Sequence, residues 1–541
     1  MTPGATNPTC ADATQPPDDR TLGAYSDDPP WNVDLTSLSW RAGLTARRQQ
    51  VRARVPELTR PRRVPPLRRL ARVSARLGLA LARWRIAEMR SSSGRAGRRR
   101  RLSREMRLAC EDLGSTFIKL GQIISSGHGL FPAELVEEFS ACRDAVPAER
   151  FETVRRVVEG DLGMPLEAVF IEFDREPVAA ASIAQVHRAV LAESFGGPVE
   201  VVVKVQRPSI GEVVHTDIEV MAWLAERLVG RIPVAALANP PALVEVFAQS
   251  IVEELDFRLE AENMVDVASY LADTDQRAFV VPRPHPDLVT ERVLVMERLS
   301  GFAFDDVARI EGAGLDTHEI IRSGMIAFLE GCLLHGIFHG DLHGGNLFVR
   351  PDGRTALLDH GITGRLTEPK RRAFLRLLLA ATVSNPQGQL EALRDLGALP
   401  ADTDIAAMVV DLGLDRPGVD PTTLERDELV AELNRIVGAL MGYGARMPRE
   451  LLLFAKNLVF LDAAIATLAP DLDLFAEIIH ISGYFAENHG SRLAAEVGMR
   501  PEDYEVDLTA LKGQFGVDPE TEQLSYAELL ERRELIRRRL G

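Results

Sequence analysis

Three polar side chains in the second half of the chain have the types and spacing needed to handle phosphate. Asp341 lies in the segment His339–Asn346 (HGDLHGGN), Asn346 follows it by five residues, and Asp359 comes thirteen residues later. Transfer of a phosphoryl group needs an acidic residue that orients and deprotonates the acceptor, and oxygen ligands for magnesium. The spacing therefore predicts Asp341 as a catalytic residue and Asn346 and Asp359 as ligands of Mg²⁺.

The same spacing occurs in protein kinases, where a metal-binding Asn follows the catalytic Asp and a second metal-binding Asp lies on the next hairpin. Such a site also needs a lysine on a strand of a small lobe to hold the α- and β-phosphates, paired with a helix carboxylate. Lys204, within residues 201–205 (VVVKV), fits the lysine role. For its partner, spacing alone leaves five candidates open: Glu253, Glu254, Asp256, Glu260 and Glu262.

The segment that precedes Lys204, in the place of a glycine-rich loop, is rich in alanine, with the sequence PVAAASIAQVH over residues 177–187. Glycine lets backbone amides approach phosphates and adopts positive φ, so alanine predicts a stiffer lid and an unusual nucleotide preference. The predicted nucleotide-binding residues come from this loop, from Lys204 and from the end of the last strand expected in the small lobe. They are Ala179, Ala180, Ala181, Ser182, Lys204, Met296, Glu297 and Leu299.

The elements that must position these residues fall into a small lobe and a large one. Short β-branched runs bounded by turn residues predict the strands of one small sheet, at 169–171, 199–205, 279–281 and 292–296. Helical periodicity covers 108–165, 217–229 and 241–271 and most of the chain after residue 301, apart from strands at 347–349 and 356–358. The predicted fold class is α+β, with a small mixed lobe and a large helical lobe.

Four motifs, in this order, resemble the UbiB family of atypical kinases (AarF/UbiB/ADCK). Residues 113–122 (LGSTFIKLGQ) are similar to its K-x-G-Q signature, residues 177–187 to its alanine-rich loop, and residues 254–256 (ELD) to its E-x-D motif. The fourth motif is the segment 339–346 together with Asp359. The similar region runs from about 108 to 470, roughly two thirds of the chain.

The resemblance implies a bilobal protein-kinase-like fold with an extra N-terminal helical K-x-G-Q segment, and ATP or ADP with Mg²⁺ as cofactors. It also implies that Lys204 pairs with Glu260. The family includes proteins needed for isoprenoid-quinone biosynthesis, so it implies a lipid or small-molecule substrate. One departure is His360, where the family usually has Phe after the metal-binding Asp; others are Gly340, Leu342 and Gly344, where it often has Ala, Pro and Pro.

In that family the K-x-G-Q segment covers the place where a protein kinase binds its peptide substrate, which implies little phosphorylation of other proteins. Carried over to this chain, Lys119 and Gln122 would lie in the active site. Glu254 and Asp256 of the E-x-D motif would face the K-x-G-Q helix.

Composition and periodicity divide the chain into six predicted regions. They are a disordered tail (1–40), a basic amphipathic helical extension (41–107), the K-x-G-Q helical segment (108–165), a small lobe (166–300), a large lobe (301–470) and a C-terminal helical extension (471–541).

The basic extension contains a helix with two faces. Its apolar face carries Leu70, Val73, Leu77, Ala80, Leu81 and Trp84, and its basic face carries Arg68, Arg69, Arg72, Arg76, Arg83 and Arg90. Such a helix either binds an anionic membrane surface, with Arg toward the phosphates, or packs on the protein's own body. Two apolar residues, Leu79 and Ile86, fall outside the apolar face.

Charge and composition exclude several classes. With 63 Lys and Arg against 79 Asp and Glu, the net charge of −16 argues against a nucleic-acid partner. Four cysteines without C-x-x-C spacing indicate no zinc site and a reducing, cytoplasmic setting. The N-terminus lacks the features of a signal peptide, and the most apolar stretch, 451–468, is interrupted by Lys456, Asn457 and Asp462. No transmembrane span is predicted, and any membrane contact would be peripheral, on the inner face.

Two other functions remain open. The segment HGDLH at 339–343 also resembles small-molecule phosphotransferases such as aminoglycoside and choline kinases, which lack the K-x-G-Q and E-x-D elements. A third alternative is a nucleotide-binding scaffold without turnover.

Overall fold

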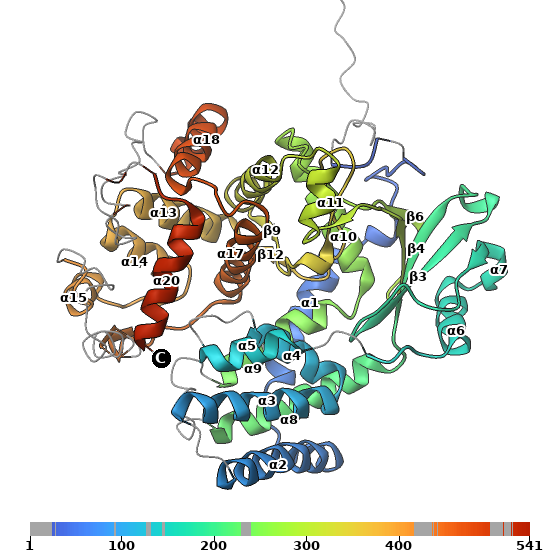
Figure 1. Ribbon diagram of the computed structural model, residues 1–541. Helices are drawn as coiled ribbons and strands as arrows, with labels where there is room; N and C mark the ends of the chain where they lie inside the picture. The colour runs from blue at the N-terminus through green and yellow to red at the C-terminus, as the bar shows by residue number, and fades with distance from the viewer. Residues whose placement is uncertain are drawn as a thin grey trace, which may run out of the picture.

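An antiparallel sheet forms the centre of the small lobe, with the strand order β1-β3-β4-β7-β6 and β2 beside β3 (Figure 1). The computed structural model describes residues 24–27, 29–90, 94–125, 131–142, 146–228, 240–415, 435–436, 438–440, 442–497, 512, 521 and 523–540. The strands of this sheet are β1 (Phe170–Phe173), β2 (Ala179–Ala180), β3 (Ala184–Leu191), β4 (Glu200–Gln206), β6 (Pro284–Val289) and β7 (Val293–Glu297).

Alternation along β4 determines which of its side chains face the core of the small lobe and which face α10. Val201, Val203 and Val205 are buried in a core shared with α6 (Phe151–Leu162) and the short helix α7 (Leu166–Val169). Because successive side chains of a strand point to opposite faces, Lys204 lies on the other face, toward α10 (Phe257–Asp273). The strand thus presents one lysine to the cleft while its valines hold the lobe together.

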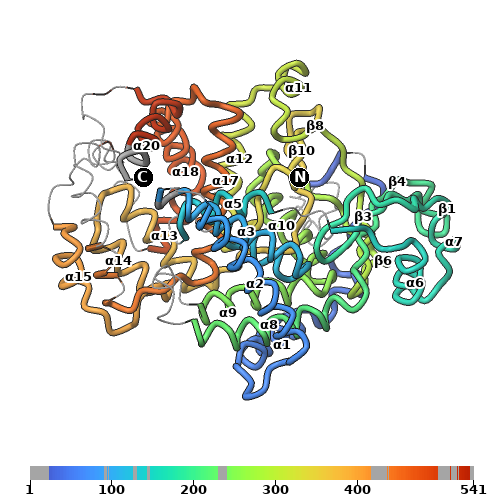
Figure 2. Tube along the Cα trace, turned by 60° about the horizontal axis from the view of Figure 1, so that its bottom comes forward, coloured from blue at the N-terminus to red at the C-terminus, as the bar shows by residue number. Residues whose placement is uncertain are grey.

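A layer of helices lies along both lobes, as Figure 2 shows. It contains α1 (Leu44–Leu58), α2 (Leu67–Met89), α3 (Arg95–Leu113), α4 (Ser115–Ser125), α5 (Ala133–Ser140), α8 (Ile210–Leu228) and α9 (Pro240–Glu253). Its core joins Phe117 of α4 and Phe139 of α5 to Phe247 of α9. Gly121 lets α5 approach α4 closely, since a Cβ at this position would lie 2.8 Å from the Phe139 ring. The glycine of the K-x-G-Q motif is therefore a packing requirement.

The large lobe is mostly helical and contains two small sheets, β5-β11-β10-β8 and β9-β12. Its helices are α11 (Val307–Gly312), α12 (Thr317–Glu330), α13 (Glu368–Thr382), α14 (Pro386–Asp395), α15 (Ile405–Asp411), α17 (Arg449–Leu468), α18 (Leu474–Val497) and α20 (Tyr526–Leu540). Its strands are β5 (Phe279–Val280), β8 (Phe302–Ala303), β9 (Ile337–His339), β10 (Leu347–Val349), β11 (Thr355–Leu357) and β12 (Thr363–Arg365). Phe454 of α17 packs between Phe328 and Phe374, with ring centroids 5.5 and 4.6 Å away.

Helix α17 is the one helix among the described residues whose length and apolar composition would suit a membrane span. Its position explains that composition without a bilayer. Leu451, Leu453 and Phe454 are buried in the core of the large lobe, and Asn457 is fully buried against the catalytic loop.

Residues 24–40 pack against the small lobe, so the prediction of a disordered tail is wrong for this segment; residues 1–23 and 28 lie outside the described residues. The Val281 N–H donates to the Ala24 carbonyl at 2.8 Å, and the Arg283 guanidinium lies 4.7 Å from the centre of the Tyr25 ring. Asp27 pairs with Arg354 of the large lobe at 3.0 Å. The Pro- and Asp-rich composition conceals a few apolar anchors that are enough to fix the segment: Ala24, Tyr25, Val33, Leu38 and Trp40.

The bilobal fold predicted from the sequence is confirmed, with differences in where its parts begin and end. Strand β5 pairs with β11 of the large lobe and not with the small-lobe sheet. Helix α6, placed with the K-x-G-Q segment by its periodicity, packs under the small-lobe sheet. The core of the large lobe continues beyond residue 470, through Phe475 and Leu493 to Leu529. The helix predicted at 241–271 is divided by residues 254–256 into α9 and α10.

The amphipathic helix α2 supports the intramolecular alternative for only part of its apolar face. Leu70, Val73 and Leu77 pack in the core of the helical layer. Leu81 is exposed, and so are Leu79 and Ile86. Packing on the body therefore accounts for one stripe of the helix and leaves apolar residues on its outer side.

Replacing Tyr25 with Ala should destabilise the protein by about 3–5 kcal/mol, because the substitution empties a fully packed aromatic site. Tyr25→Phe keeps the ring and its contact with Arg283, so it should retain most of the stability. The measurement is the melting temperature of the three proteins. Equal values for the wild type and Tyr25→Ala would show that the segment 24–40 does not support the small lobe.

Candidate active site

Asp341 lies in the loop between β9 and the short 3-10 helix Gly344–Asn346, and His339 fixes the backbone of this loop. The Asp341 N–H donates to His339 Nδ1 at 3.0 Å. On the other side of the ring, His339 Nε2 bonds the carbonyl oxygen of Asp359. Burial lowers the pKa of His339, so the neutral ring can accept at one nitrogen and donate at the other. One histidine thus ties the two loops that carry the predicted catalytic and metal-binding carboxylates.

Two lysines hold the Asp341 carboxylate, one from each side. Lys119 Nζ lies 3.5 Å from Oδ2 and 3.1 Å from Glu254 Oε2. Lys456 of α17 pairs with Oδ1. Burial would raise the pKa of Asp341, but the ammonium groups of Lys456 and Lys119 outweigh it and hold the pKa well below its usual range. The carboxylate is therefore ionised and has a cation on each oxygen.

Lys204 forms the second ion cluster, at the boundary of the small lobe. Its Nζ lies 2.7 Å from Glu260 Oε1 and 3.3 Å from Asp359 Oδ2. Burial opposes the charge on Lys204, but the carboxylates of Asp359 and Glu260 overcome it and raise the lysine's pKa. Burial raises the pKa of Glu260 to about 7, although Lys204 lowers it. Because several carboxylates converge on one ammonium group, we assign the charge to Lys204 and the uptake of a proton near neutral pH to Glu260.

Asn346 and Asp359 are suited to a magnesium ion bound together with a phosphate ligand. Mg²⁺ usually takes one or two carboxylates plus substrate phosphates and waters, with no dedicated protein cage. The Asp359 side chain remains 44% exposed although it contacts Lys204. Its other oxygen, Oδ1, accepts from the Gly361 N–H at 2.8 Å, and Asn346 Nδ2 donates to the Asp341 carbonyl at 3.2 Å. An oxygen-rich pair beside Lys204, the lysine predicted to hold phosphates, fits this mode of binding.

The alanine-rich loop is anchored at its tip. Ser182 and Ile183 are buried, and Ile183 packs in the core of the helical layer. Arg207 Nε donates to the Ala181 carbonyl at 3.0 Å, and the Arg207 N–H donates to the Ile183 carbonyl at 2.9 Å. Ala179 and Ala180 form β2, paired with β3. The loop is therefore held to the K-x-G-Q helices more firmly than a free glycine-rich lid would be.

Residues at the end of the small lobe fit the predicted nucleotide contacts less well. The Glu297 carboxylate is bound by Ser26 and Arg283, and its N–H donates to the Arg283 carbonyl at 2.9 Å. Its side chain thus binds Ser26 and Arg283, and the contact of Glu297 with a nucleotide stays a prediction. Met296 and Leu299 are buried on either side of it, and their contacts with a nucleotide stay predictions.

The E-x-D motif divides between two neighbours. Glu254 pairs with Lys119 and so faces the K-x-G-Q helix as expected. The expectation for Asp256 is wrong: its carboxylate pairs with Arg47 of α1 at 3.2 Å and with Arg258, and it caps the N-terminus of α10. Arg52 of α1 also pairs with Glu253 at 2.6 Å. Helix α1 thus holds the start of α10, the helix that carries Glu260.

Lys456 and Asn457 are the functional residues that motif spacing missed. The Leu342 N–H donates to Asn457 Oδ1 at 3.3 Å, and Asn457 Nδ2 donates to the His339 carbonyl. A signal for Lys456 does exist in the composition, because arginine supplies nearly all of the 63 basic residues and lysine occurs only at 119, 204, 370, 456 and 512. Three of these five lysines meet at the carboxylates of the site.

The two lobes, the Lys204–Glu260 pair and the Asp341, Asn346 and Asp359 set define an atypical protein-kinase-like fold. A model of the ABC1 atypical kinase-like domain matches residues 141–393. An uncharacterized protein of Mycobacterium tuberculosis is 36% identical over 387 residues, covering 69% of this chain and 76% of that protein. The chain belongs to the family of ABC1 atypical kinases that includes the UbiB and aarF proteins.

Named members of that family are similarly close. An aarF domain-containing protein kinase of Arabidopsis thaliana, described as chloroplastic, is 31% identical and covers 69% of this chain and 73% of that protein. UbiB of Aliivibrio fischeri, named as a probable protein kinase, is 30% identical and covers 69% of each. A solved complex of Rv3197 from Mycobacterium tuberculosis with erythromycin is 23% identical, with a TM-score of 0.36 over 61% of this chain and 89% of that chain.

The raised pKa of Glu260 predicts a pH-dependent contribution to stability. A carboxyl group whose pKa is higher in the folded than in the unfolded protein contributes its full stabilisation at pH values below its unfolded-state pKa. That stabilisation is lost as the pH rises through the folded-state pKa of about 7. The melting temperature of the wild type relative to Glu260→Gln should therefore fall by at least about 2 °C between pH 5.5 and pH 8, the shift that roughly 1 kcal/mol produces in a lobe of this size. A constant difference would contradict the assignment of the proton to Glu260.

Proposed function

We propose that the protein binds Mg²⁺ with ATP or ADP in the cleft between the lobes and transfers the γ-phosphoryl group of ATP. The observation that carries this proposal is the placement of Lys204 between Glu260 and Asp359, at 2.7 and 3.3 Å. A lysine fixed in this way is the group that protein kinases use to hold the α- and β-phosphates. If these charged groups had no ligand to bind, the Asp359 carboxylate would not need to remain partly exposed to solvent.

Each residue has a separate task in this mechanism. Lys204 binds the phosphates and Glu260 positions it, while Asn346 and Asp359 would hold the magnesium. A magnesium ion held there would supply positive charge that neutralises the phosphates. Asp341 orients the acceptor hydroxyl and takes its proton, which its low pKa allows only as the oxygen attacks phosphorus. His339 and Asn457 keep the Asp341 backbone in place.

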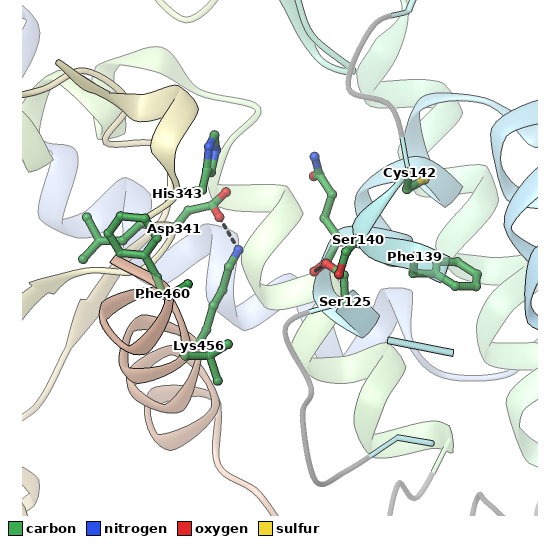
Figure 3. A pocket seen from close by; sticks show the side chains of 12 residues that line it. Ser125, Phe139, Ser140, Cys142, Asp341, His343, Lys456 and Phe460 are labelled. Atoms are coloured by element: carbon green, nitrogen blue, oxygen red, sulfur yellow. Dashed lines mark hydrogen bonds and ion pairs between the residues drawn. The ribbon is translucent and has the colours of Figure 1, made fainter. Parts of the chain in front are cut away.

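The acceptor in this proposal is a small molecule or lipid and not another protein. Helices α4 and α5 lie opposite the catalytic loop (Figure 3), and Lys119 of α4 pairs with Asp341. An extended peptide would have to displace these helices and their buried core of Phe117 and Phe139. As the resemblance to UbiB proteins implies, we place the activity in isoprenoid-quinone or other lipid metabolism.

Helix α2 supports a peripheral membrane contact, although not through the stripe predicted from the sequence. It is the outermost helix of its layer (Figure 1). Its outward side exposes Leu67, Leu79, Ile86 and Met89, which fall within about one third of the helix circumference. Exposed arginines lie beside this stripe at positions 72, 83 and 90, and Arg68 lies within it. An apolar stripe bordered by arginines is suited to the boundary of anionic headgroups.

Millimolar MgADP or MgATP should raise the melting temperature of the wild-type protein, since a ligand that binds the folded state stabilises it. Asp359→Asn should weaken MgADP binding about tenfold or more, equivalent to about 1.4 kcal/mol. Asp352→Asn removes a carboxylate from an exposed turn and is the matched control. The absence of a nucleotide-dependent shift in the wild type would remove the proposed function.

Turnover is tested separately. Asp341→Asn should lower phosphate release from MgATP by about 100-fold or more, because it removes the group that accepts the proton. If neither protein releases phosphate while both bind MgATP, the protein is a nucleotide-binding scaffold without turnover. Equal phosphate release by the wild type and Asp341→Asn would contradict the catalytic role of Asp341.

For the membrane contact, Leu79, Ile86 and Met89 are replaced together by Glu, at positions that are already exposed. The triple variant should lose most of its co-sedimentation with anionic vesicles at low salt. The wild type should lose its own binding as salt is raised, because salt screens the arginines. Val410→Glu, an exposed apolar site on α15, is the control. Equal sedimentation of the wild type and the triple variant would exclude α2 as the contact.

A further inference from the structure

A cavity of about 350 Å³ lies beside Asp341, between α17 and the K-x-G-Q helices (Figure 3). One wall comes from α4 and α5, and the other from the catalytic loop and α17. Its lining is Gln122, Ser125, Phe139, Ser140, Cys142, Asp341, Leu342, His343, Lys456, Val459, Phe460 and Ala463. The volume is that of a small-molecule site, and the lining combines apolar walls with a few convergent polar groups.

Both oxygens of Asp341 are paired with an ammonium group, so an acceptor hydroxyl that approaches the carboxylate must share an oxygen with a lysine or take the place of that lysine. Lys119 is held by two carboxylates, Glu254 and Asp341, and its side chain is 12% exposed. Among the described residues, Lys456 has Asp341 as its one ionic partner. Lys456 is also the lysine that lines the cavity. It is therefore the lysine that a ligand entering the cavity would displace.

The charge of Lys456 determines which ligand can displace it. A neutral alcohol that took its place on Asp341 would leave a largely buried ammonium group without a partner, which is costly. A ligand with its own anionic group would pair with the released ammonium. The hydroxyl of such a ligand would then reach Asp341 Oδ1, and its apolar body would lie against the apolar part of the lining that α17 provides, which includes Val459, Phe460 and Ala463.

We propose that this cavity binds a small hydroxylated organic acid, and that Lys456 selects it by exchanging Asp341 for the acid's anionic group. This inference rests on the proposed function, because it makes the acid the acceptor of the phosphoryl group. The acceptor O–H gives its proton to Asp341, and its oxygen forms a bond to the γ-phosphorus of ATP. The bond from that phosphorus to the β,γ-bridging oxygen breaks, and ADP leaves with the electron pair.

The test compares two probes that differ in charge alone, 3-(4-hydroxyphenyl)propionate and its amide. Binding is measured calorimetrically to the full chain saturated with MgADP. The wild type should bind the acid at least about tenfold more tightly than the amide, the preference that one charge pair of about 1.4 kcal/mol provides. Lys456→Met should abolish this preference, and Lys456→Arg should keep it, since Arg retains the charge. Lys370→Met removes a lysine of α13 that pairs with Glu450 and should leave the preference unchanged.

A second variant tests the location of the site independently of the charge. Ala463→Phe adds a ring at the exposed rim of the cavity and should lower binding of the acid at least tenfold without changing MgADP affinity. The inference is overturned if the wild type binds both probes equally, or if Lys456→Met or Ala463→Phe binds the acid as the wild type does. Failure of all proteins to bind MgADP would instead overturn the proposed function.

Discussion

The arrangement of this protein depends on three largely buried lysines that neutralise four carboxylates. Lys119 and Lys456 hold Asp341, and Lys204 joins Glu260 to Asp359. Glu254 completes the set by pairing with Lys119. Removing one partner from such a cluster leaves a buried charge uncompensated, which typically costs about 3–5 kcal/mol. The residues come from α4, β4, α10, α17 and the segments beside them, so the cluster fixes both lobes and the K-x-G-Q helices to one another.

This constraint explains why the acceptor side of the site is closed. In an ordinary kinase this side is open to a peptide; here α4 is tied to the catalytic aspartate by a lysine and to α5 by the packing of Gly121 on Phe139. Arg207 also holds the alanine-rich loop in place by donating a hydrogen bond to the Ala181 carbonyl. A cavity of about 350 Å³ lies beside Asp341 on this side, and its size favours small acceptors.

Short spacing predicts which residues lie together, and distant packing escapes it. The spacing of Asp341 and Asp359 predicts neighbouring loops, and His339 bonds the backbone of both. Lys204 is predicted from its place in an apolar strand upstream of them, and it contacts Asp359. Lys456 lies 115 residues after Asp341 on an apolar helix, so no spacing rule connects the two.

The errors have the same origin. The segment 24–40 folds because a few anchors such as Tyr25 find partners far along the chain, which its composition does not reveal. Asp256 pairs with Arg47, a residue outside the region covered by the motifs. In both cases the position of the residue depends on a contact between segments that are far apart in the sequence, and the local sequence pattern does not reveal that contact.

The lysine cluster is tested most directly by measuring the acylation rate of each lysine in the native protein by mass spectrometry. With five lysines in the chain, every site can be followed. Lys119, Lys204 and Lys456 should react at least about tenfold more slowly than Lys370, because their ammonium groups are buried and ion-paired, and denaturation should make the rates equal. If Lys119 or Lys456 reacts as fast as Lys370 in the native protein, the clamp on Asp341 does not exist.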